Sequence, residues 1–165
     1  MIKKSVADAL NKQIQHEQSN AHSYRAVALY FESLNLHGLS AWLAKQAGDE
    51  VGHAEKFIKH LVERGGTVAL GAIAAPQTKF ETPLEAVKAV KALEVATTAT
   101  INKLLELARK ENDYALEVAL HWFITEQVEE EQWTTELTGQ METFYKHPGQ
   151  LYMLDHHWGK RAKAE

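Results

Sequence analysis

The chain contains no cysteine. Disulfide bonds, thiolate zinc sites and cysteine-ligated iron–sulfur clusters are therefore excluded. Any metal site in this chain must use histidine and carboxylate ligands, which suit iron, manganese or zinc better than soft metals.

Long apolar runs and basic excess are also missing. No stretch of about 18 apolar residues exists, so nothing is expected to span a membrane. Lysine and arginine number 18 against 22 acidic residues, a net charge of −4, so nothing in the composition favours nucleic acid. The first residues contain no apolar core of a signal peptide. We expect one cytoplasmic domain of 165 residues.

Apolar residues recur at alternating steps of three and four, which predicts amphipathic helices. The expected helices cover residues 5–35, 39–64, 83–110 and 114–145, and a short fifth covers 150–161. Ser5 is expected to cap the first helix, and Thr82 and Pro83 to begin the third. The break between the first two helices is expected at His37-Gly38, because glycine commonly ends a helix.

Residues 66–82 form a long connection with no helical stripe. The preceding helix is about 39 Å long at 1.5 Å per residue. The connection reaches about 56–61 Å when extended, enough to run the full length of the bundle. The second and third helices would then be parallel. One long crossover between two helical hairpins is typical of an all-α, ferritin-like four-helix bundle.

Six polar residues interrupt the apolar stripes, and the same intervals of 33 and 36 residues relate them twice. They are Glu17, Glu50 and His53, then Glu94, Gln127 and Glu130. Four buried carboxylates without lysine or arginine beside them would repel one another and cost several kcal/mol. Water or raised pKa values would relieve part of this cost. A pair of bound metal ions explains it better, and di-iron carboxylate bundles use a similar ligand pattern.

Three further groups flank these residues. Tyr24 lies two turns after Glu17 and is either a core aromatic or a hydrogen-bond donor to a ligand carboxylate. Trp122 precedes Phe123 on the fourth helix, and packing is favoured over a redox role. The acidic residues beside the six are either a solvated face or a weaker third cation site. They are Asp49, Glu126 and Glu129.

Four segments resemble the bacterial non-haem ferritins in order and spacing, and the resemblance extends over essentially the whole chain. The segments are HEQSNAHSY, DEVGHAEKF, KALEVATTAT and TEQVEEE, followed by the tail QLYMLDHHWGKR. The resemblance implies hollow shells of 24 subunits that store a ferric mineral. It also implies a ferroxidase activity, which oxidises Fe(II) with dioxygen or peroxide.

The same resemblance implies particular ligands. The first iron ion would be bound by Glu17, Glu50 and His53. The second would be bound by Glu50, Glu94 and Glu130, with Gln127 and Tyr24 beside the pair. A third iron site would use Asp49, Glu126, Glu129 and Glu130. Asp49 stands where the family usually has the longer glutamate. Gly52 stands where the similar bacterioferritins have a haem-binding methionine, so no haem is expected.

Two other functions remain open. One is a di-iron or di-manganese oxidoreductase acting on an organic or peroxide substrate, for which a dimer would be expected rather than a shell. The other is a structural bundle without metal. Particle size separates the first from storage, and metal analysis decides the second.

Overall fold

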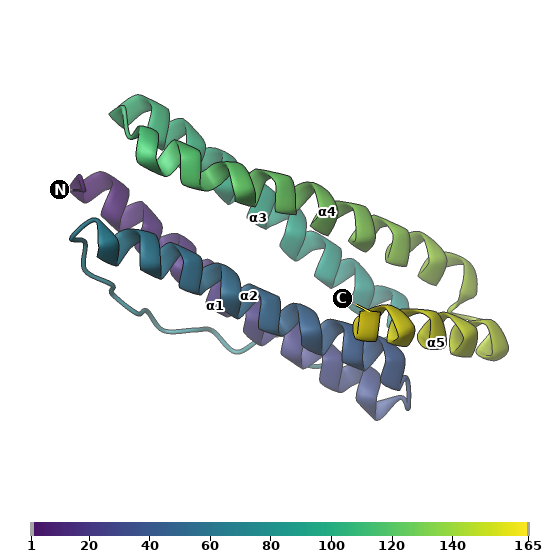
Figure 1. Ribbon diagram of the computed structural model, residues 1–165. Helices are drawn as coiled ribbons and strands as arrows, with labels where there is room; N and C mark the ends of the chain where they lie inside the picture. Colours follow the sequence, from purple (N-terminus) through teal and green to yellow (C-terminus); the bar gives the residue numbers. More distant parts are fainter. Residues whose placement is uncertain (1, 165) are drawn as a thin grey trace.

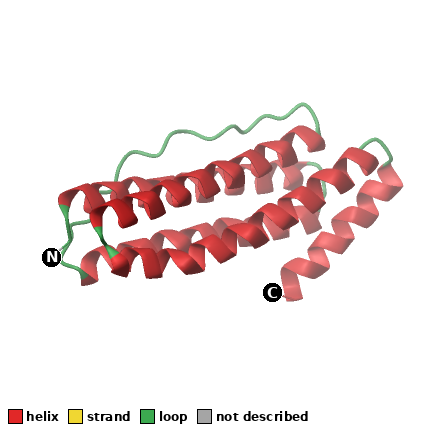
Figure 2. Ribbon diagram, turned by 90° about the horizontal axis from the view of Figure 1, so that it is seen from above, coloured by secondary structure: helices red, strands yellow, loops and turns green. Residues whose placement is uncertain are grey.

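The computed structural model describes residues 2–164, which contain five helices and no strand. The helices are α1 (Lys4–Ser33), α2 (His37–Glu63), α3 (Pro83–Glu111), α4 (Tyr114–Phe144) and α5 (Pro148–Ala164). The first four form an elongated bundle, and α5 crosses one end of it (Figures 1 and 2). The expected all-α bundle with one long crossover and a fifth helix is confirmed. Within the described residues, no helix combines the length and hydropathy needed to cross a bilayer.

The long connection runs beside the bundle from the end of α2 to the start of α3 (Figure 2). Side chains of α1 hold it in place. Asn11 Nδ2 donates to the carbonyl of Thr67 at 3.0 Å, and Gln15 Nε2 donates to the carbonyl of Ala72 at 2.6 Å. Thr82 caps α3 as expected, since its Oγ1 accepts the N–H of Glu85 at 3.1 Å.

The start of α1 and the turn before α2 differ from the expectation. Lys3, not Ser5, is the N-cap of α1, and no side chain caps that end. The Ser5 hydroxyl instead donates to Glu111 at 3.1 Å. The chain between α1 and α2 reverses at Asn35, whose φ of 58° is left-handed. Asparagine tolerates this conformation, so the turn needs no glycine and α2 already includes Gly38.

Gly38 has a different role, which is close packing against α5. A Cβ atom there would lie 1.9 Å from the carbonyl oxygen of Asp155. The Asp155 carboxylate accepts the N–H of Leu39 at 2.8 Å and so caps α2 from another helix. Trp158 is fully buried beside this contact. These contacts hold α5 on the bundle, and it is longer than the expected 150–161.

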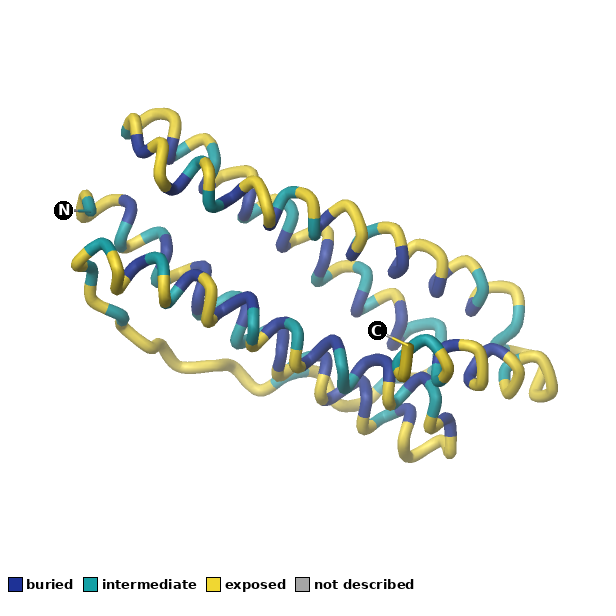
Figure 3. The backbone as a smooth tube through the Cα atoms, viewed as in Figure 1, coloured by how far each residue is buried: buried dark blue, intermediate teal, exposed yellow. Residues whose placement is uncertain are grey.

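The four expected stripes face the interior (Figure 3). Apolar side chains form two clusters, one toward each end of the bundle. One includes Phe31, Trp42 and Leu137, and the other includes Leu10 and Phe57. Neither cluster contains the six polar residues of the stripes, although all six are buried. The helices therefore carry a polar layer between two apolar regions.

Candidate metal centre

Helices α1 and α2 bring three potential metal ligands together. Glu17 on α1 and Glu50 and His53 on α2 each offer a ligand atom, and these atoms lie within 4.8 Å of one another. All three side chains are buried, with exposures of 0%, 3% and 4%. Across residues 2–164, no other group of three potential ligands is as closely gathered.

Two carboxylate oxygens in this cluster have no hydrogen-bond partner. Gln13 Nε2 donates to Glu17 Oε1 at 2.6 Å, but Glu17 Oε2 is buried without a partner. Glu50 Oε2 is also buried and unpartnered, with His53 Nδ1 3.4 Å away. Buried polar atoms are normally satisfied, so these neighbouring carboxyl groups need either a proton shared between them or a cation. Carboxylate and imidazole donors together suit iron, manganese or zinc.

Helices α3 and α4 complete the layer with two more carboxylates. The Tyr24 hydroxyl donates to Glu94 Oε1, and Gln127 Nε2 donates to Glu94 Oε2 at 3.2 Å. The indole N–H of Trp133 donates to Glu130 Oε2. Each carboxylate thus keeps further acceptor capacity while a neighbour fixes its orientation, as outer partners do around metal ligands.

Burial and mutual repulsion favour protons on these acids. Burial and the Glu50 charge raise the pKa of Glu17 well above its usual value. Burial and the Glu94 charge raise the pKa of Glu130 to about 8. Burial lowers the pKa of His53, which favours the neutral imidazole that binds metals. A cation entering the layer would therefore displace protons from the carboxylates.

Known proteins resemble this chain in sequence and in the arrangement of their helices. A family model described as a ferritin-like domain matches residues 7–144. A bacterial non-heme ferritin of Staphylococcus aureus (strain USA300) is 32% identical over 165 residues, covering 100% of this chain and 99% of the relative. Another, from Staphylococcus haemolyticus (strain JCSC1435), is 37% identical over 131 residues, covering 79% of each chain. The chain belongs to the ferritin family.

Solved structures agree with this assignment. An open-pore ferritin from Archaeoglobus fulgidus superposes with a TM-score of 0.94 at 34% identity, covering 96% of this chain and 98% of that chain. A form of the A. fulgidus protein engineered to be closed gives the same TM-score and identity. Family and fold together support iron storage.

Aromatic rings surround His53 in this ferritin. Trp122 and Phe123 pack edge-on against the imidazole, with ring centroids 5.5 and 6.1 Å away. Trp122 is 40% exposed, and the Lys56 ammonium lies 3.8 Å from its ring centroid. Packing against His53 accounts for the position of Trp122.

The flanking acidic residues are less closely gathered than the buried ligands. Asp49 is half-buried and pairs with Lys45 at 2.9 Å. Glu126 is half-buried and Glu129 is exposed. Asp49 and Glu126 both contribute to the raised pKa of Glu130, so their charges act on the layer from α2 and α4.

Two residues of the site were missed by sequence reasoning. Gln13 contacts Glu17 from one turn earlier, and Trp133 contacts Glu130 from one turn later. Their spacings of four and three residues are those of neighbours on a helix face. This spacing could have identified Gln13 and Trp133 as neighbours of the two carboxylates. It could not show which of their side-chain atoms points toward the carboxylate.

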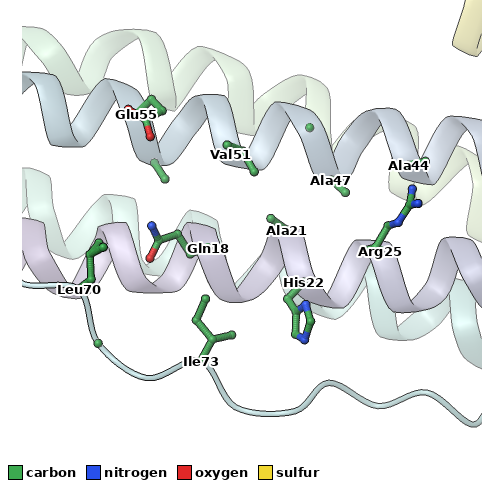
Figure 4. A pocket seen from close by; sticks show the side chains of 13 residues that line it. Gln18, Ala21, His22, Arg25, Ala44, Ala47, Val51, Glu55, Leu70 and Ile73 are labelled. Carbon is green, nitrogen blue, oxygen red and sulfur yellow. The ribbon is translucent and has the colours of Figure 1, made fainter.

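A groove of about 610 Å³ lies away from the candidate metal ligands. Helices α1 and α2 and the long connection enclose it, with Ala21, His22, Arg25 and Ile73 among its side chains (Figure 4). None of the candidate iron ligands lines it.

Proposed function

We propose that this chain is an iron-storage ferritin with ferroxidase activity. Two Fe(II) ions enter the polar layer as substrates and are oxidised by dioxygen or peroxide. Copies of the chain, 24 as the family resemblance implies, enclose the ferric product in a shell. The observation that carries this proposal is the pair of unpartnered buried oxygens on Glu17 and Glu50.

The proposed ligands divide between two ions. Glu17 and His53 bind the first ion, Glu94 and Glu130 bind the second, and Glu50 bridges them. No lysine or arginine is buried within residues 2–164, although the charge of Lys56 acts on His53 from outside the layer. Iron supplies positive charge within the layer, and the carboxylates in turn favour the higher charge of the ferric product.

The neighbours position these ligands. The pKa of Tyr24 is raised well above its usual value by burial and by Glu94, so its hydroxyl stays protonated and keeps donating to that carboxylate. Gln127 orients the other oxygen of Glu94. Aromatic packing holds the His53 ring. These contacts fix the ligands before iron arrives, which lowers the cost of binding.

An accessory third iron site on Asp49, Glu126, Glu129 and Glu130 is part of the same proposal. A cation there would have to displace Lys45 from Asp49. We therefore expect weaker binding at this site than within the buried layer. Glu129→Gln should change the ratio of iron oxidised to oxygen consumed more than it changes the first oxidation.

Stopped-flow oxidation of Fe(II) tests the buried site. Glu17→Gln and His53→Ala should each slow the fast phase by at least about tenfold. Loss of a residue that only hydrogen-bonds to a metal ligand commonly costs that much, so loss of a ligand should cost no less. His22→Ala is the matched control, because His22 is exposed on the same helix as Glu17. Normal fast phases in both site variants would refute the proposal. Particle size by light scattering tests the shell separately.

A further inference from the structure

A chain of hydrogen bonds leads from the polar layer to a half-buried acid on α4. Gln127 Nε2 donates to Glu94 Oε2 at 3.2 Å and to Thr98 Oγ1 at 3.2 Å. The Thr98 hydroxyl donates in turn to Glu131 Oε1 at 2.5 Å. Thr98 lies on α3 and Glu131 on α4, and both are half-buried. Glu131 is therefore connected through two side chains to Glu94, a candidate iron ligand.

The backbone carbonyl of Glu94 determines which way the Gln127 amide faces. This carbonyl oxygen accepts from Gln127 Nε2 at 3.3 Å, and a carbonyl oxygen has no proton to donate. If the amide were turned over, Gln127 Oε1 would lie against the carbonyl oxygen with no proton between the two atoms. The amide nitrogen, not the amide oxygen, therefore faces Glu94.

Thr98 accepts from this nitrogen because Glu131 takes the hydroxyl proton. The hydroxyl has one proton, and the amide nitrogen of Gln127 is a donor only. Glu131 Oε1 is the acceptor for that proton. Without Glu131, Thr98 could donate the same proton to Gln127 Oε1 if the amide turned over. Glu131 thus favours the observed orientation over the reversed one.

The orientation of the amide determines what Gln127 can do for a cation in the layer. With its nitrogen toward Glu94, Gln127 holds one carboxylate oxygen in place and has no ligand atom there. In the reversed orientation it would present an oxygen, which can bind a cation, and Glu94 Oε2 would lose its donor. The two orientations would give the second iron ion different ligands.

We propose that Glu131 is a positioning residue for the second iron ion. By accepting the Thr98 proton, it keeps Gln127 as a donor to Glu94 rather than a ligand. The role toward iron rests on the proposed ferroxidase function, whereas the orientation of the amide does not. Residues beyond the ligands commonly tune a metal site by orienting the ligands in this way.

Anaerobic titration with Co(II), as a probe for Fe(II), tests the positioning role. Glu131→Leu should weaken binding of the second Co(II) by about tenfold, the lower end of the effect of an outer partner, and leave the first unchanged. Glu131→Gln should bind both ions normally, because its amide oxygen still accepts the Thr98 proton. This variant has no charge at residue 131, so it separates the hydrogen bond from electrostatic attraction.

Thr98→Val tests whether Glu131 acts through Thr98. Valine has nearly the shape of threonine and has no proton to donate, so nothing draws the Gln127 oxygen inward. Adding Glu131→Leu to Thr98→Val should therefore not weaken the second ion further. Thr100→Val is the matched control, because Thr100 is also half-buried on α3 but donates to the carbonyl of Thr97. It should bind both ions normally.

Urea unfolding of the metal-free protein gives a readout that does not depend on iron. Glu131→Leu should raise the unfolding equilibrium constant more when residue 98 is threonine than when it is valine. The difference should be roughly threefold to tenfold, the net value of one hydrogen bond. Fixed protein concentration keeps the variants comparable.

The outcomes separate this inference from the proposed function. If the unmodified protein shows no fast Fe(II) oxidation, the ferroxidase proposal fails, and the metal-free measurement still decides whether Glu131 acts through Thr98. If Glu131→Gln and Glu131→Leu weaken the second Co(II) equally, charge alone acts and the positioning role is overturned. Equal effects of Glu131→Leu with threonine and with valine at residue 98 would also overturn it. Neither result would affect the ferroxidase proposal.

Discussion

Leu137 and Glu130 lie on the same stripe of α4, two turns apart, and both are buried. Leu137 belongs to an apolar end cluster, where burial of its side chain stabilises the fold. Glu130 lies in the polar layer, where burial and the Glu94 charge raise its pKa to about 8. One helix therefore supplies both the stabilising core and a region whose burial opposes folding.

The difference between these regions shows where stability and function are separated. Each apolar cluster contains side chains from several helices and needs no ligand. The polar layer needs positive charge, because two of its oxygens have no partner. We infer that the end clusters supply the free energy that keeps the acids of the layer facing one another.

The largest expected effect comes from truncating the apolar cluster. Leu137→Ala should lower the free energy of unfolding by about 2–5 kcal/mol, because it removes buried methyl groups and leaves a cavity. Urea unfolding at fixed protein concentration measures this. The fast phase of Fe(II) oxidation should remain normal in the folded variant.

Leu29→Ala is the control for that measurement. Leu29 is 55% exposed, so its truncation should change the free energy of unfolding by less than about 0.5 kcal/mol. Equal losses in the two variants would show that the end cluster is not where stability resides.

The polar layer should respond in the opposite direction. Glu130→Gln should stabilise the iron-free protein by about 1–3 kcal/mol at pH 8, because a neutral amide replaces an acid whose charged form is disfavoured. The amide oxygen can still accept the Trp133 N–H. Urea unfolding of metal-free protein at pH 5 and pH 8 measures the effect.

The direction of the pH dependence follows from the folded and unfolded pKa values of Glu130. Its pKa is about 8 in the folded protein and 4.5 for a solvent-exposed glutamate. The folded state binds the Glu130 proton more tightly than the unfolded state does. The contribution of Glu130 to the free energy of unfolding is therefore fully present below about pH 4.5 and is lost as the pH rises to 8. Glu130→Gln should make the decline shallower. A decline of unchanged slope would mean that Glu130 does not hold this proton.

The stripes, and with them the composition of the polar layer, could be predicted because helical periodicity is a local property. Glu17 and Glu94 were assigned to the interior from spacing alone, and both are buried. The placement of α5 could not be predicted, because it depends on the approach of Gly38 to Asp155 from a distant segment.

The direction of individual side chains could not be predicted from the sequence, and this explains the other features that the sequence analysis missed. Gln13 lies on the same face as Glu17, but only coordinates show that its amide donates to that carboxylate. The chain turns at the left-handed residue Asn35, whereas the sequence predicted the break at His37-Gly38, because asparagine also tolerates this conformation. The flanking acids Asp49, Glu126 and Glu129 come from two helices, α2 and α4, so spacing along one helix does not determine where their oxygens meet.

Asp113 is buried like Glu130, but it pairs with a cationic side chain. It caps α4 by accepting the Leu116 N–H at 3.1 Å and pairs with Arg64 at 2.8 Å. Burial alone would raise the pKa of Asp113, but these partners outweigh it and lower the pKa. Its stability contribution is therefore present above the usual aspartate pKa and is lost as pH falls.

Asp113→Ala should consequently destabilise the protein, by about 1 kcal/mol for the lost cap, where Glu130→Gln stabilises it. Asp113→Asn keeps a capping oxygen and loses the charge, so it should cost less than alanine at pH 7. Urea unfolding of both variants measures the difference, and Fe(II) oxidation should be normal in each. If removing Asp113 stabilised the protein as removing the Glu130 charge does, burial alone would govern these acids. The pairing of Asp113 with Arg64 would then not account for the difference in stability between the two acids.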